Sequence, residues 1–119
     1  MKKRFINLGV LLLIVSISII SSLTFALDRD RIAMQGFVME LDLNKNVMIV
    51  NERAFFWNPQ TAFFDEKGSP ITVDKLRAKT WVYIEGMRDN ARKRAIAEKI
   101  YLLPNYINEK EKHLYPFIQ

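Results

Sequence analysis

The apolar residues beyond position 31 fall into short runs that are separated by Asn, Asp, Gly and Pro. This pattern is typical of β-strands joined by tight turns. It predicts five strands, at Ile32–Leu41, Val47–Val50, Ala54–Trp57, Thr80–Met87 and Ala95–Leu103. One helical turn is expected between the third and fourth strands, at Val73–Leu76, with Thr72 as its cap. Five short, curled strands favour closure, so the predicted fold is mainly β, a five-stranded OB-like barrel.

Two details of this prediction concern single segments. Residues 92–103 also carry Ala, Glu and Lys at positions that suit a helix, but a strand is preferred because the sheet needs it to close. Gly36 lies inside the first strand, where a glycine indicates a bulge or a sharp bend.

Alternation assigns the side chains of the last hairpin to two faces. Val82, Ile84 and Gly86 are expected to point inward. The matching inward set on the fifth strand is Ile96, Ile100 and Leu102. Three aromatic residues then share the outer face, Trp81, Tyr83 and Tyr101.

The N-terminus has the features of a bacterial signal peptide. Three cations at residues 2–4 precede an apolar stretch, Gly9–Ile20, and Ala26 stands at a suitable cleavage position. The alternative is an uncleaved membrane anchor, since residues 5–27 are 23 uncharged residues. We expect a signal peptide at 1–26, a barrel domain at 27–104 and a C-terminal tail at 105–119, in a periplasmic or secreted protein.

Charge and cysteine content restrict the partners. The chain carries a net charge of +5, but three of its 18 basic residues belong to the signal segment, which leaves +2 for the exported part. Such a small charge argues against nucleic acid as a partner. The chain has no cysteine, so disulfides, thiolate metal sites and a lipid-anchored cysteine are excluded.

The sequence offers no arrangement of catalytic residues. The one histidine, His113, lies in the tail, and a general base has to be held close to its target. The acidic pairs Asp28 with Asp30 and Asp65 with Glu66 match no calcium-loop spacing. We therefore expect a protein that is not an enzyme, with no catalytic residue, no cofactor and no metal.

A series of short motifs runs through the barrel region. In order they are Gly36-x-Val38, Val47-x-Ile49-x-Asn51, Thr61-x-Phe63, Asp65-x-x-Gly68, Val82-x-Ile84-x-Gly86 and Ala97-x-Lys99-Ile100. The series resembles a group of exported bacterial domains of unknown function that have a small OB-like barrel. The resemblance covers Ile32–Leu103 and implies the fold, but it supplies no site residues. This chain departs from the pattern at Trp57 and in the tail after Pro104.

The strongest candidate for a binding site combines cations with aromatic rings. In OB-folds the loop between strands four and five borders the ligand, where cations could hold an anion while aromatic rings stack on sugars or bases. The alternative is a solvated loop, with the aromatic residues covered by the tail. The predicted ligand-binding residues are Trp81, Tyr83, Arg88, Arg92, Lys93, Arg94 and Tyr101.

The sequence therefore predicts a non-catalytic binding or interaction module of the cell envelope. Its partner is expected to be an anionic or carbohydrate ligand, or an envelope protein. Two alternatives stay open. One is an assembly subunit that uses the apolar tail segment Tyr115–Ile118, and the other is a small carboxylate-dependent enzyme.

Overall fold

Seven strands and two short 3-10 helices make up the part of the chain that the computed structural model describes, residues 30–89, 91 and 94–119. The predicted signal peptide at 1–26 lies outside these residues. Among the described residues no helix is both long and apolar enough to span a membrane. The elements are β1 (Arg31–Asp42), β2 (Val47–Val50), β3 (Arg53–Phe56), β4 (Ala62–Phe64), β5 (Pro70–Ile71), η1 (Val73–Lys75), β6 (Trp81–Asp89), β7 (Arg94–Leu103) and η2 (Lys112–Leu114).

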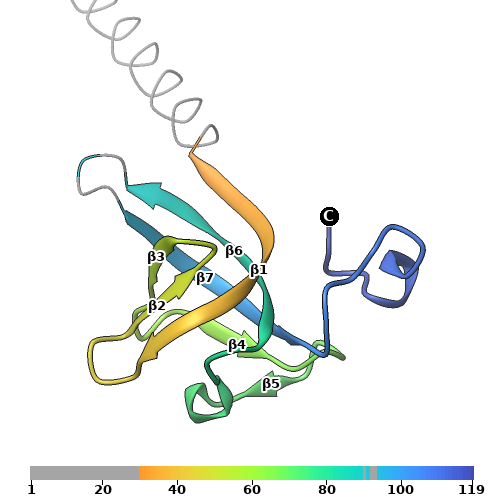
Figure 1. Ribbon diagram of the computed structural model, residues 1–119, viewed down its shortest axis with the longest axis horizontal. Coiled ribbons are helices and arrows are strands. Elements are labelled where there is room, and N and C mark those ends of the chain that lie inside the picture. Colours follow the sequence, from red (N-terminus) through yellow and green to blue (C-terminus); the bar gives the residue numbers. More distant parts are fainter. Residues whose placement is uncertain (1–29, 90, 92–93) are drawn as a thin grey trace, which may run out of the picture. The chain divides into compact units, whose positions relative to one another are not determined.

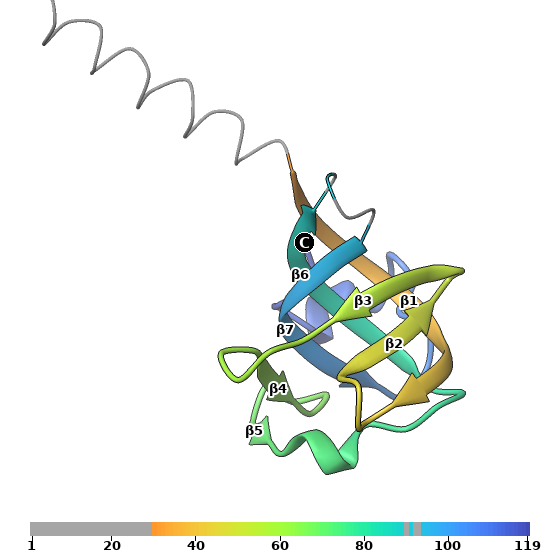
Figure 2. The ribbon, with the colours of Figure 1, turned by 90° about the vertical axis from the view of Figure 1, so that its left-hand side faces the viewer.

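Five of the strands form a closed ring (Figures 1 and 2). Antiparallel pairs join β3 to β2, β2 to β1, β1 to β6 and β6 to β7, and a parallel pairing of β3 with β7 closes the ring. The predicted five-stranded barrel is thus confirmed, as is a strand rather than a helix at the end of the barrel sequence. The short strands β4 and β5 were not predicted, and they extend the sheet beside β7.

Strand β1 is long enough to pair with both of its neighbours, β6 and β2. Its first part, up to Phe37, pairs with β6, and its second part pairs with β2. The register between β1 and β2 shifts at Met39, so the strand has a bulge there, and not at Gly36, where the sequence predicts a bulge or a sharp bend. Gly36 has a different role, because a Cβ there would collide with the side chain of Val50 on the adjacent strand. The glycine therefore permits close approach of two strands.

The helical turn before β6 is present, but its cap differs from the prediction. The Thr72 hydroxyl caps no backbone amide of η1 and instead donates a hydrogen bond to the Asp74 carboxylate. The turn is a 3-10 helix, and the residue that follows it, Leu76, is buried in the core.

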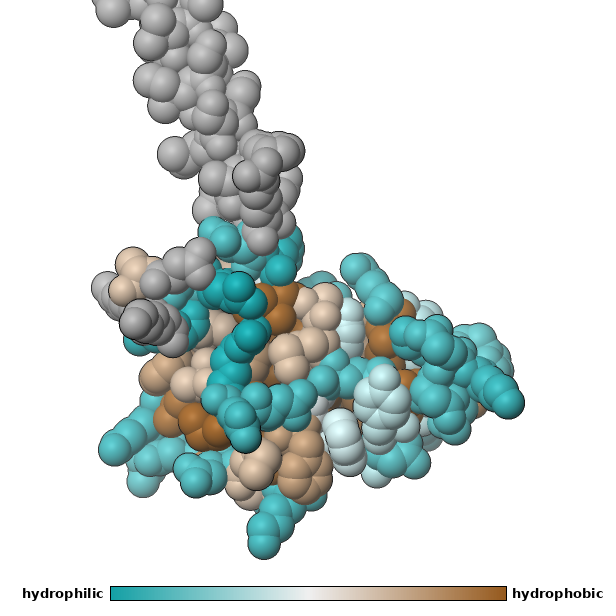
Figure 3. Space-filling model, turned by 45° about the horizontal axis from the view of Figure 1, so that its top comes forward, coloured by the Kyte–Doolittle hydropathy of each residue, from teal (hydrophilic) through white to brown (hydrophobic). Residues whose placement is uncertain are grey.

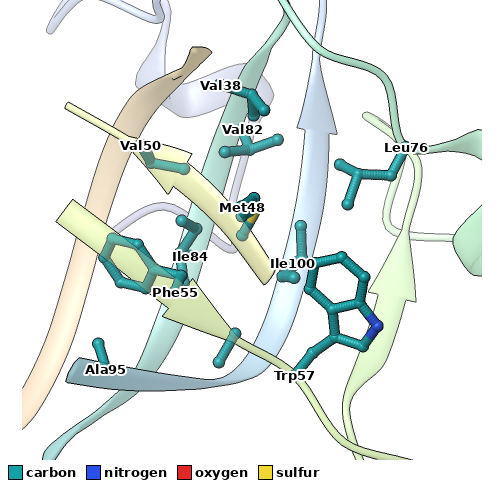
Figure 4. Packing of buried hydrophobic residues seen from close by; sticks show 11 residues of the cluster. Val38, Met48, Val50, Phe55, Trp57, Leu76, Val82, Ile84, Ala95 and Ile100 are labelled. Carbon is teal, nitrogen blue, oxygen red and sulfur yellow. The ribbon is translucent and has the colours of Figure 1, made fainter. Parts of the chain in front are cut away.

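The core fills the ring and comes from every barrel strand (Figure 4). The predicted inward set on β7 was right for Ile100 and Leu102 but wrong for Ile96, whose place is taken by Ala95 and Ala97. An extra residue in β7 opposite Glu85–Gly86 shifts the register and reverses the alternation there. The buried cluster comprises Val38, Met48, Val50, Phe55, Trp57, Leu76, Val82, Ile84, Ala95, Ala97 and Ile100.

Candidate functional site

The C-terminal tail covers the outer aromatic face of β6 and β7. Tyr83 is only 1% exposed, and Tyr101 is also buried. The Tyr101 ring stacks on Phe117 of the tail, with ring centroids 4.0 Å apart and planes inclined by 8°. It also stacks on Phe64 of β4, with a centroid distance of 4.7 Å. The tail therefore completes a second hydrophobic cluster outside the barrel.

Hydrogen bonds hold the beginning of the tail on β1. The Gln35 side chain donates to the carbonyl of Ile107 at 2.9 Å and accepts from its amide at 2.8 Å. This paired contact resembles one step of a β-ladder, and the Ile107 side chain is fully buried beneath it. Figure 3 shows mainly hydrophilic and intermediate residues on the tail, at the right, because the apolar side chains of the tail face the barrel.

This cover decides what the predicted aromatic residues can do. Trp81, Tyr83 and Tyr101 share one face, as expected, but two of them are buried under the tail. Trp81 is half-buried between Phe37 and Tyr106. Burial raises the pKa of the Tyr83 phenol, and of the Tyr101 phenol as well. Tyr83 and Tyr101 are therefore covered by the tail, as in the alternative of a solvated loop with covered aromatic residues.

Two of the predicted cations, Arg88 and Arg94, lie at the other end of the same hairpin. Trp81 and Arg88 are seven residues apart along β6, which corresponds to about 23 Å of strand. Arg94 lies on the barrel wall, 3.8 Å from the Asp89 carboxylate and 4.9 Å from the centroid of the Phe56 ring. Arg92 and Lys93 lie outside the described residues. Arg88 and Arg94, the predicted cations that the structure describes, therefore lie apart from the aromatic rings, and a binding role for the loop itself stays a prediction.

A different set of residues surrounds a pocket of about 350 Å³ on the barrel wall. It opens between the β1–β2 turn, the β3–β4 connection and the start of η1. We call it the Trp57 pocket, and its lining residues are Asn46, Trp57, Asn58, Pro59, Thr61, Phe63, Thr72 and Val73.

The backbone holds two sides of this pocket in place. Asn46 ends the β1–β2 turn with φ at 55°, a left-handed conformation that asparagine tolerates. Its carbonyl accepts a hydrogen bond from the Trp57 amide at 3.1 Å. The turn and the residue after β3 are thereby fixed to each other.

The β3–β4 connection is a tight turn with its own internal hydrogen bonds. The Thr61 amide donates to the Asn58 carbonyl at 3.0 Å, and the Asn58 amide donates to the Thr61 hydroxyl at 3.1 Å. Pro59 occupies the second turn position, which its fixed φ suits. The Thr61 hydroxyl also donates to the carbonyl of Ala97 at 2.6 Å and so fixes the turn to β7.

The pocket has an aromatic floor and neutral polar groups at its rim. Trp57 is 7% exposed and meets the Phe63 ring edge to face, with centroids 6.0 Å apart. Its indole nitrogen faces away from the other labelled core side chains (Figure 4). No described residue accepts a hydrogen bond from that nitrogen, and it is not sealed from solvent. No charged side chain is among the described residues that line the pocket.

The sequence does not indicate this pocket, because Trp57 has the pattern of an ordinary strand residue. Two signals were present around it. Asn46 ends a turn segment, and an Asn-Pro pair directly follows Trp57. What the sequence did not show is that three connections meet at one place on the barrel.

No protein-family model matches the chain, and no curated protein matches it. Among solved structures the chain is similar to PilY2, a fimbrial biogenesis protein from Pseudomonas aeruginosa PAO1. The sequence identity is 16%, the TM-score is 0.50, and the match covers 71% of this chain and 93% of PilY2. Ag(I)CusF has 13% identity and a TM-score of 0.47, covering 61% of this chain and 97% of that one. A tryptophan-to-alanine variant of CusF with Cu(II), from Escherichia coli, has 13% identity and a TM-score of 0.45, covering 62% and 92%. At such identities the likeness is one of fold, that of a small β-barrel-like protein.

Proposed function

We propose that this chain is an exported, non-catalytic binding module of the cell envelope, with its ligand site at the Trp57 pocket. The observation that carries the proposal is the pocket itself, a preformed hollow whose walls are tied together by hydrogen bonds. Ligand sites in proteins are commonly preformed, mostly apolar hollows with a few placed polar groups.

The chemistry of the lining supports binding rather than catalysis. Its polar side chains are two amides, two hydroxyls and an indole, and none of these has an ordinary pKa near neutrality. Such groups orient a ligand by hydrogen bonding but transfer protons poorly. The strand order of the ring, with β3 parallel to β7, supports an OB-like barrel, a fold that serves many binding proteins.

Export is tested by producing the full chain in a bacterial host and determining the mass of the protein in each cell fraction. We expect an envelope species that begins at Leu27. A full-length chain confined to the cytoplasm would overturn the envelope assignment. An uncleaved chain in the membrane fraction would replace the signal peptide by the anchor at residues 5–27.

The pocket is tested on the exported protein by NMR, with the indole resonance of Trp57 as the reporter. The probes are glucose, N-acetylglucosamine, cyclohexanol and a short acetylated aliphatic peptide. Val73→Glu places a charge at the rim and is expected to abolish a saturable shift. Leu114→Glu is the matched control, because Leu114 is 64% exposed on the tail. If no probe shifts the resonance saturably, the pocket is not a binding site.

An assembly subunit is the second candidate, and one observation favours it. The packed tail still exposes two large apolar side chains, Tyr106 and Leu114. The fold neighbour PilY2 is itself described as a fimbrial biogenesis protein. If these side chains mediate association, Leu114→Ser should lower the molar mass measured by light scattering while the fold stays intact. A monomer of unchanged mass before and after the substitution would remove the support for self-association.

A further inference from the structure

We propose that the Trp57 pocket takes one neutral sugar ring; this inference rests on the binding function proposed above. A sugar ring presents apolar C–H faces together with several hydroxyl groups. The pocket presents the complement of both, with aromatic and aliphatic walls and neutral hydrogen-bonding groups at the rim. Its volume of about 350 Å³ lies at the small end of the usual range for ligand sites, roughly 300–1,000 Å³.

The apolar part of the lining suits the C–H face of a sugar. The Phe63 and Trp57 rings meet edge to face, so they form a corner rather than a flat wall. Pro59 and Val73 add aliphatic surface from the turn and from η1. A ring-shaped ligand can therefore bury apolar surface against several elements of the barrel at once.

The unused hydrogen-bonding groups argue against a purely apolar occupant. The Trp57 indole N–H and the Asn46 side-chain amide bond to no described residue. The Asn58 oxygen already accepts from the Gln60 amide at 2.9 Å, which leaves its NH₂ group for a ligand. An aliphatic side chain in the pocket would cut these groups off from water without replacing their hydrogen bonds, which is unfavourable. Hydroxyl groups of a sugar would satisfy them.

Charge decides against an anion at this place. The Thr72 hydroxyl at the rim donates to the Asp74 carboxylate, and this hydrogen bond lowers the pKa of Asp74. The rim therefore has an acidic neighbour, whose charge Lys75 and Arg77 partly offset, and it has no cation among the described lining residues. Other hollows on the molecule differ in this respect, since one is lined by Arg31, Glu85 and Lys99. A neutral ligand is the class that the Trp57 pocket fits.

The test follows the Trp57 indole resonance of the exported protein during titration with glucose, N-acetylglucosamine and cyclohexanol. Cyclohexanol has the same ring size with a single hydroxyl group, so it separates sugar recognition from apolar filling. The chain has two tryptophans, and Trp81→Phe assigns their resonances. We expect at least one sugar to shift the Trp57 resonance saturably and at lower concentration than cyclohexanol.

The key variant is Asn46→Gly, which removes the amide and keeps the left-handed backbone that φ of 55° requires. It should weaken sugar binding about tenfold, as expected for one lost hydrogen bond, and leave the cyclohexanol response unchanged. Asn51→Gly is the control for the backbone change, because Asn51 has φ of 50° in the β2–β3 turn and is not among the pocket residues; since it also loses the hydrogen bond from the Phe37 amide, binding is compared where both variants are fully folded. We expect it to bind the sugar normally.

The outcomes separate this inference from the proposed function. A saturable shift with cyclohexanol and with no sugar would overturn the sugar assignment and leave a binding pocket. Equal weakening by Asn46→Gly and Asn51→Gly would show that the Asn46 amide makes no contact with the sugar, which also contradicts the inference. If no probe shifts the Trp57 resonance saturably, both the inference and the proposed function are overturned.

Discussion

Two aromatic clusters of this barrel look alike in the sequence and behave in opposite ways in the structure. Tyr83 and Tyr101 lie on the outside of the barrel wall, where the tail covers them. Trp57 belongs to the core and yet borders a pocket that is open to solvent. The tail packs on the outer aromatic face, whereas Trp57, which the sequence places at the end of the third strand, borders the pocket that we propose as the binding site.

The difference teaches that exposure is decided by segments far away along the chain. Ile107, which seals the outer face, is 72 residues from the Gln35 side chain that holds it. At the pocket, three connections meet around Trp57 and leave the pocket beside its ring open. The covered face depends mainly on apolar burial, and the pocket depends on hydrogen bonds within turns.

The largest effect is expected at Ile107. Ile107→Ala removes a fully buried side chain from the cluster between tail and barrel, and such changes cost about 2–5 kcal/mol. The free energy of unfolding, measured by urea titration, should fall by that amount. Leu114→Ala on the exposed side of the tail should change it by less than about 0.5 kcal/mol. Equal small effects at both positions would mean that the tail does not seal the barrel.

Gln35→Ala is expected to have the next largest effect, because it removes both hydrogen bonds to the Ile107 backbone. Leaving these backbone groups unpaired should cost about 1–3 kcal/mol of stability. Hydrogen exchange of the Ile107 amide should speed up in the same variant. Gln60→Ala changes an exposed glutamine in the β3–β4 turn and should alter neither quantity. Unchanged exchange at Ile107 after Gln35→Ala would show that the paired contact does not hold the tail.

The pocket side of the comparison is tested at Thr61. Thr61→Val removes the hydroxyl that bonds to the Ala97 carbonyl, a buried contact, and should cost about 1–2 kcal/mol. It should also loosen the turn and weaken any ligand response of Trp57. Thr80→Val is the control, because its hydroxyl makes a bond of the same length, 2.6 Å, to the Arg77 carbonyl in an exposed setting. Equal costs for the two variants would contradict the view that burial makes the Thr61 bond important.

Much of the barrel could be predicted because its strands are long enough to show their pattern. Val47–Val50 was found with its bounds, and the long strands were found to within two residues. The strands β4 and β5 have three and two residues, too few for alternation to be visible. Ile96 was assigned to the wrong face because a bulge adds one residue, and a single added residue reverses every following position.

The candidate site was harder to predict, because it depends on contacts between distant parts of the chain. Alternation placed Tyr83 and Tyr101 correctly on one face, but it could not show that Phe117 lies on top of them. The same limit applies to Trp57. Its neighbours in the pocket come from the β1–β2 turn and from η1, and their convergence follows only from the closed ring.

The smallest effect concerns pH, and it tests whether the outer face stays covered in solution. Burial raises the pKa of Tyr83, opposed by the hydrogen bond from the Gln119 amide, and burial also raises the pKa of Tyr101. A phenol whose pKa is higher in the folded state is ionised more readily in the unfolded chain. The resulting stability is therefore complete below the unfolded value, about 10, and is lost as the pH rises through the folded pKa.

The unfolding midpoint in urea should thus decrease as the pH is raised from 9 to 11 and beyond. The double variant Tyr83→Phe with Tyr101→Phe should show a shallower decrease, because the two buried phenols no longer contribute. Tyr106→Phe replaces an exposed tyrosine and should keep the slope of the unmodified protein. If the double variant and the unmodified protein have the same slope, the phenols are hydrated and the tail does not cover them. The outer aromatic face would then be as accessible as the Trp57 pocket. The predicted binding role of Tyr83 and Tyr101 would again be consistent with their exposure.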